Sequence, residues 1–179
     1  MSLREELEQI DGDNGSLELF LTRRRSKKSF VNQLVLLITP NEPTLQIKAT
    51  ALLKRLAENE IRFTRPQLAA ILDLLAEVTH WEAKLHLCQT LQHVEIPKGS
   101  ETKVVWFLER CLAEENKFLR AWAYNGFYEL AKQHHEYYDY AMEQLERAQK
   151  EKSAAVKARL RNIMKAMNHL AVTRPSGRA

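Results

Sequence analysis

The sequence predicts an all-α protein built from four tandem helix pairs. Four stretches each carry an apolar line along one helix face, and these lines begin at Leu45, Ala83, Leu119 and Val156. Within each line the residues follow at i+4, i+8 and i+11, the spacing of one side of a helix. A second apolar helix precedes every line at a constant offset, marked by Leu34, Leu72, Leu108 and Leu145. In both series the successive residues lie 38, 36 and 37 positions apart, and such a period indicates stacked repeats.

The breaks between the repeats follow from proline, glycine and capping residues. We expect an N-terminal cap over 1–28, four repeats over 29–60, 64–96, 100–134 and 136–170 (a repeat domain of 29–170), and a disordered tail over 171–179. Pro40 and Pro43 separate the two helices of the first repeat, because proline lacks the N–H that a helix interior needs. Thr64 and Asn116 are predicted N-caps, and Thr79 is predicted to form a capping box with Glu82.

Composition excludes several classes of protein. The chain has 179 residues and a net charge of +4, and it contains no run near the roughly 18 apolar residues that a membrane span requires. Cys88 and Cys111 have no CxxC partner, which favours a reduced, cytoplasmic location without a membrane. Charge is uneven, because the last 30 residues hold eight bases and one acid. Such a basic segment attracts phosphates or acidic partners, or forms a solvated helix face.

The second helix of each repeat resembles that of HEAT repeats, in the wider armadillo-like (ARM) superfamily. Two repeats open this helix with a branched apolar residue followed by a base, at Leu119-Arg120 and at Val156-Lys157. Ala83-Lys84 is a weaker match, and the first repeat departs from the pattern with Leu45-Gln46. The resemblance spans about residues 29–170. It implies a right-handed α–α superhelix of about four HEAT-like helix pairs, with the second helices lining the concave face.

A stripe one residue past each core position is expected to lie on that concave face. Its basic and aromatic members are the candidate partner-binding residues, namely Lys84, Arg120, Tyr124, Tyr128, Lys157, Arg161 and Lys165. Because concave solenoid surfaces bind partners, the favoured function is a non-catalytic protein-binding scaffold or adaptor for an acidic peptide or domain. The alternative partner is a nucleic acid, bound through the basic C-terminal helix and the stripe. The remaining interpretation is a solvated face with ion pairs inside the repeats.

No enzymatic or metal motif supports a competing function. The sequence lacks GxSxG, a phosphate-binding glycine loop and H-E-x-x-H, so no cofactor and no catalytic residue are expected. A HEAT-like DNA glycosylase is the less favoured alternative. Such enzymes place an aspartate beside aromatic residues in a basic cleft, but no aspartate of this sequence lies on a predicted second helix, so Glu129 would have to serve. His86 and His93 lie seven residues apart on one helix, roughly 10 Å, which is too far for one metal ion. His134 and His135 are adjacent and are expected to point apart.

Trp106 is predicted to lie on the convex side of the molecule. In the first helix of the third repeat it falls opposite Val104 and Leu108, at roughly 200° from Val104 on a helix of 100° per residue. A tryptophan there exposes a large apolar ring. Trp106 therefore marks either a contact with a partner or a second copy of the chain, or a ring folded onto the side-chain stem of Arg110 or Lys103.

Overall fold

The molecule is all-helical, as the sequence predicts. The computed structural model describes residues 1–25 and 29–173, and no strand occurs within these ranges. The helices are α1 (Leu3–Gln9), α2 (Asn14–Arg24), α3 (Phe30–Leu36), α4 (Pro43–Glu58), α5 (Arg65–Asp73), α6 (Trp81–Thr90), α7 (Glu101–Leu112), α8 (Lys117–Gln133), α9 (Tyr138–Lys150) and α10 (Ala154–Thr173). Short 3₁₀ turns follow at Leu74–Ala76, Leu91–His93 and His135–Tyr137.

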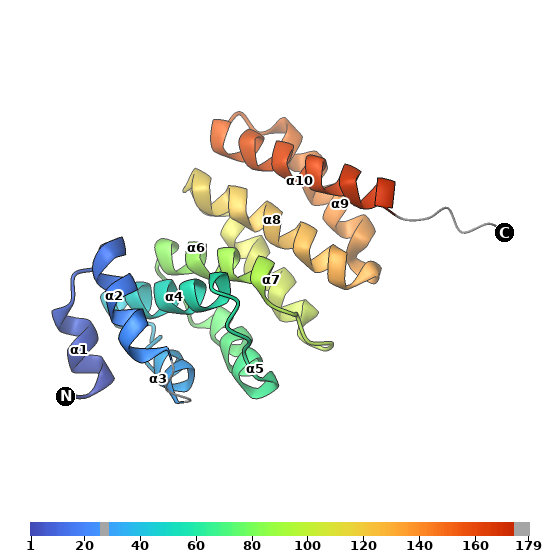
Figure 1. The fold of residues 1–179 in the computed structure, drawn as a ribbon. Coiled ribbons are helices and arrows are strands. Elements are labelled where there is room, and N and C mark those ends of the chain that lie inside the picture. Colours follow the sequence, from blue (N-terminus) through green and yellow to red (C-terminus); the bar gives the residue numbers. More distant parts are fainter. Residues whose placement is uncertain (26–28, 174–179) are drawn as a thin grey trace.

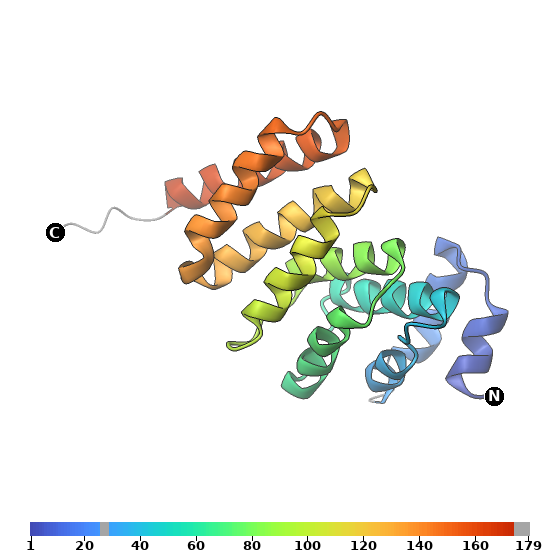
Figure 2. The same cartoon turned by 180° about the vertical axis from the view of Figure 1, so that it is seen from behind.

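The helices stack in a row, with α1 and α10 at opposite ends (Figure 1). One layer consists of α4, α6, α8 and α10, each in contact with the next. The other layer begins with α3, α5 and α7, which also contact their neighbours in turn, and Figure 2 shows this layer from behind. Helices α3 and α7 pack on the second helix of their own repeat, whereas the close contacts of α5 are to α3 and α7.

The two ends of the chain relate to the expected segments as follows. Helices α1 and α2 both pack on α4, and residues 26–28 of the expected cap lie outside the described residues. The segment expected to be a disordered tail, 171–179, begins inside α10, which runs to Thr173; residues 174–179 lie outside the described residues. Among the helices described, none combines the length and the apolarity needed to cross a membrane.

Helix starts agree with the sequence at two of three predicted caps. Thr64 forms a capping box with Gln67, and the Asn116 side chain accepts hydrogen bonds from the first turn of α8. The capping box predicted at Thr79 is wrong, because His80 caps α6 by accepting from the backbone N–H of Glu82. The Thr79 N–H is instead bonded to the side chain of Gln46, 3.1 Å away in the preceding repeat.

Three of the four apolar lines are buried as predicted, apart from a half-buried Val94 at the end of the second, while the fourth shifts by one residue. Met164, expected in the core of α10, is 41% exposed, whereas Ile163 is 2% exposed. On a helix of 100° per residue, the i+8 position lies about 80° from the start of the line, on its flank. In α4, α6 and α8 the next helix of the layer covers that flank. On α10 the flank is open, so the core uses Ile163 instead.

Helix α8 joins two hydrophobic clusters. Leu119, Ala123 and Phe127 belong to the large cluster that extends back to the N-terminal helices. Tyr124 and Tyr128, on the other side of α8, belong to a smaller cluster formed with α9 and α10. Packing on both sides makes α8 the most buried helix, and Gly126 lets it approach Leu108 of α7 closely.

Candidate partner-binding surface

The residue after the first core position of the second helix bonds to the next helix pair in the first three repeats. In the first repeat this residue is Gln46, which is buried. Its carbonyl oxygen accepts from the backbone N–H groups of Thr79 and His80, at 3.1 and 2.9 Å, in the turn before α6. Its amide donates to the carbonyl oxygen of Thr39 at 3.0 Å. A single side chain therefore links the turns of the first and second repeats.

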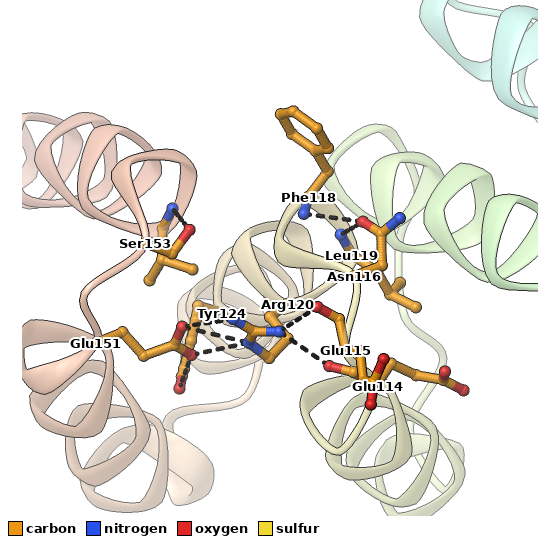
Figure 3. Close-up of polar contacts among 10 residues, drawn as sticks. Glu114, Glu115, Asn116, Phe118, Leu119, Arg120, Tyr124, Glu151 and Ser153 are labelled. Carbon is orange, nitrogen blue, oxygen red and sulfur yellow. Dashed lines mark hydrogen bonds and ion pairs between the residues drawn. The ribbon is translucent and has the colours of Figure 1, made fainter.

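The equivalent residues of the next two repeats are cations that pair with carboxylates. Lys84 Nζ lies 2.5 Å from Glu114 Oε1 in the turn before α8. Arg120 donates to Glu151 in the turn before α10, with Nη2 3.1 Å from Oε2. Figure 3 shows Arg120 lying between Glu151 on one side and the backbone carbonyl oxygens of Glu114 and Glu115 on the other. Each cation thus joins its own repeat to the next one.

A similar bond joins the N-terminal cap to the first repeat. Arg4 of α1 binds both carboxylate oxygens of Glu42, the N-cap residue of α4. We call these contacts rungs: a side chain of one helix pair bonds to the turn of the next. The four rungs are Arg4–Glu42, Gln46–Thr79/His80, Lys84–Glu114 and Arg120–Glu151.

The predicted concave stripe is therefore corrected for its first three repeats. Lys84, Tyr124 and Tyr128 are buried and Arg120 is half-buried, so they lie between helix pairs instead of on an open groove. Tyr124 donates a hydrogen bond to Glu151 Oε1 at 3.0 Å. Burial is the larger cause, and this hydrogen bond the next, of a rise in the pKa of Tyr124 to about 12. These side chains are covered because a residue 100° from the core line lies on the side of its helix that faces the neighbouring second helix.

Only the fourth repeat leaves its part of the stripe open among the residues described. Lys157, Arg161 and Lys165 are exposed on α10, and none forms an ion pair within the described part of the chain. They line a groove with Leu160 and Met164. We call these five residues the α10 surface. Arg159, a further cation of the helix, instead lies over the ring of Trp122, 3.5 Å from its centroid.

Trp106 lies on the outer side of α7, and both features expected of it are present. Its side chain is 46% exposed. The guanidinium of Arg110 lies over the ring, 4.5 Å from its centroid. The ring also borders a second groove together with Leu72 and Leu75. Trp106 is thus partly covered by its own chain.

The structure also brings together a cluster that the sequence analysis missed. His134 Nδ1 lies 3.1 Å from Glu101 Oε1 and 3.9 Å from Glu136 Oε1. Its Nε2 lies 2.8 Å from the carbonyl oxygen of Ile96, which only accepts hydrogen bonds. The cluster ties the start of α7 to the end of α8 through these polar contacts. Glu101 and His134 lie 33 residues apart, and no local spacing reveals such a contact.

The carboxylate considered for a glycosylase is covered by its own chain. Glu129 is buried in α8 and pairs with Lys132 at 2.5 Å.

Comparisons with protein-family models, with curated proteins and with solved structures found no match for this chain.

Proposed function

We propose that this chain is a non-catalytic protein-binding scaffold or adaptor with a HEAT-like, right-handed α–α superhelix, and that it binds an acidic protein through the α10 surface. The observation that carries the proposal is the exposure of three cations without ion-pair partners around an apolar residue. Lys157, Arg161 and Lys165 recur once per helical turn, and Met164 lies beside them. Partner surfaces in proteins combine an apolar centre with a polar or charged rim.

The exposed Met164 favours a protein over a nucleic acid. Contacts to a phosphate backbone are made by cations, hydroxyls, amides and N–H groups, which gives Met164 no partner. An acidic helix or turn would place its carboxylates near the cations and an aliphatic side chain against Met164. Truncation of Met164 would then weaken binding, and reversal of the three positive charges would also weaken it.

A nucleic acid remains the second candidate because the same three cations would neutralise phosphates. Binding to duplex DNA or RNA would then fall steeply with salt, with a slope that scales with the number of phosphates contacted. The variant with Lys157, Arg161 and Lys165 all changed to Glu would lose it. If the wild type shows no binding in an anisotropy titration at about 50 mM salt, this candidate is excluded.

Site-specific photo-crosslinking in cell extract tests the proposal directly. A photoreactive amino acid at Met164 should yield protein adducts that persist after nuclease treatment and disappear in the triple Glu variant. The same amino acid at Leu36, which is 76% exposed on α3, provides the control at a site outside the α10 surface and outside α1 and α2. If nuclease removes the adducts, the partner is a nucleic acid and not a protein. Equal adducts in the wild type and in the triple Glu variant would refute the proposed surface.

A further inference from the structure

Three of the rung donors, Gln46, Lys84 and Arg120, form a regular series on successive second helices, and the next position of that series lies on α10. Lys157 occupies on α10 the position that Arg120 occupies on α8, 37 residues earlier. The register is the same in both helices, because Leu119 and Val156, the residues just before them, are both buried. Arg120 pairs with a carboxylate of the next turn, whereas Lys157 is exposed. Lys157 is thus a fifth rung donor that faces the open end of the row.

The last two acceptors of the series share a place in their turns. Glu114 lies two residues before Asn116, the N-cap of α8. Glu151 lies two residues before Ser153, whose hydroxyl accepts from the backbone N–H of Val156 at the start of α10. An acceptor for Lys157 should therefore be an acid about two residues before the N-cap of a second helix, within the turn of a helix pair.

The first helix pair of the chain carries such an acid. Asp13 is the N-cap of α2, and Asp11 lies two residues before it in the turn between α1 and α2. Asp11 is exposed, and it forms no ion pair within residues 1–25 and 29–168. Since α1 and α10 lie at opposite ends of the row (Figure 2), Asp11 and Lys157 of one molecule do not meet.

We infer that the acidic surface bound by the α10 surface belongs to a second copy of this chain, whose α1–α2 turn stacks on α10 and supplies Asp11 to Lys157 as a fifth rung. This inference rests on the proposed function and names the partner for the same surface. The contact is head-to-tail, so repetition adds further copies in a row.

Charge and apolar contact both support this stacking. Residues 3–24, which form α1, α2 and their turn, contain six acids and three bases, whereas residues 150–173 contain six bases and one acid. The two ends therefore attract each other and repel their own kind. Leu19 on α2 is 57% exposed and Met164 on α10 is 41% exposed, so each end also offers an apolar side chain for the other to cover.

Sedimentation velocity of the full chain over a range of concentrations at low salt tests the inference. The wild-type sedimentation coefficient should rise with concentration and fall back when salt screens the ends. Asp11→Lys and Lys157→Glu should each weaken self-association roughly tenfold or more, since each change turns an attraction into a repulsion. Glu77→Lys, which reverses an exposed acid away from both ends, should leave it unchanged.

Combining the two reversals gives a sharper result. The double variant Asp11→Lys/Lys157→Glu should regain self-association, because its ends again have opposite charges. An equimolar mixture of the two single variants should regain association as an alternating row, since both ends of one variant are basic and both ends of the other are acidic. Circular dichroism melts of all variants should coincide with the wild type, because both side chains are exposed.

Three outcomes would overturn the inference. The first is a wild type that stays monomeric at every concentration. The second is association that neither reversal weakens. The third is association that the double variant does not regain although it is folded. A monomeric wild type that still gives nuclease-resistant adducts at Met164 would refute the second copy as the partner while the proposed function stands. Loss of those adducts as well would remove both.

Discussion

Replacing Gly126 by alanine should destabilise the protein, although alanine is the better helix former. Gly126 lies in the middle of α8, and a Cβ there would be 2.5 Å from Leu108 Cδ2 and 3.1 Å from Leu108 Cδ1. Leu108 is itself completely buried, so its side chain has little room to retreat. Alanine gains about 1 kcal/mol of helix propensity, and overpacking of this kind costs about 1–3 kcal/mol. Because a 2.5 Å contact with a completely buried side chain puts this cost in the upper part of the range, about 2–3 kcal/mol, the net loss should be roughly 1–2 kcal/mol.

Thermal and urea unfolding measure this loss. For a chain of this length it corresponds to a fall of about 3–6 °C in the melting temperature. The matched control is the same change in a Leu108→Ala background, where the clash is removed. There Gly126→Ala should be neutral or stabilising by up to about 1 kcal/mol. If Gly126→Ala raises the stability of the wild type by that amount, Leu108 yields freely and the close approach of α7 and α8 is not a constraint.

Three further changes test the core, its protonation and the outer face. Phe127→Ala, at a completely buried ring that meets Tyr140 edge-on, should cost about 3–5 kcal/mol in urea unfolding; a loss under about 1 kcal/mol would contradict the core line. Burial, with Lys54 and Arg55 nearby, lowers the pKa of His86 to about 4. Stability should therefore be full above about pH 6.5 and fall by at most about 3 kcal/mol toward pH 4, and His86→Gln should flatten that profile. Trp106→Ala should change the melting temperature little and leave head-to-tail association intact; loss of association would move the contact to the convex side.

The period of the apolar residues was enough to predict the helix pairs and most of the core. Periodicity indicates on which side of its own helix a side chain lies, and this was sufficient to predict the burial of Leu119 and Phe127. It does not state whether another helix covers the flank of that line. For this reason Tyr124 was expected to be exposed and is buried, and Met164 was expected to be buried and is exposed.

The polar contacts between repeats escaped prediction for a related reason. The partners in the Lys84–Glu114 and Arg120–Glu151 pairs lie 30 and 31 residues apart, and their pairing depends on how one helix pair is placed on the next. The sequence nevertheless contained the regularity, because the donors recur with the repeat period. Spacing alone did not reveal the acceptors, since they lie in turns of differing length.

The boundary between the two hydrophobic clusters runs along α8 and divides the molecule into opening units of unequal size. Detachment of α9 and α10 would expose Tyr124 and Tyr128 and would remove Tyr140 from the ring of Phe127, but Leu119 and the rest of the larger cluster would stay packed. This partial opening breaks fewer contacts than global unfolding, so it requires less free energy. Amide hydrogens of α9 and α10 should therefore exchange with solvent as one group, ahead of those of α4, α6 and α8. Helices α9 and α10 would therefore open transiently while the remaining helices stay packed.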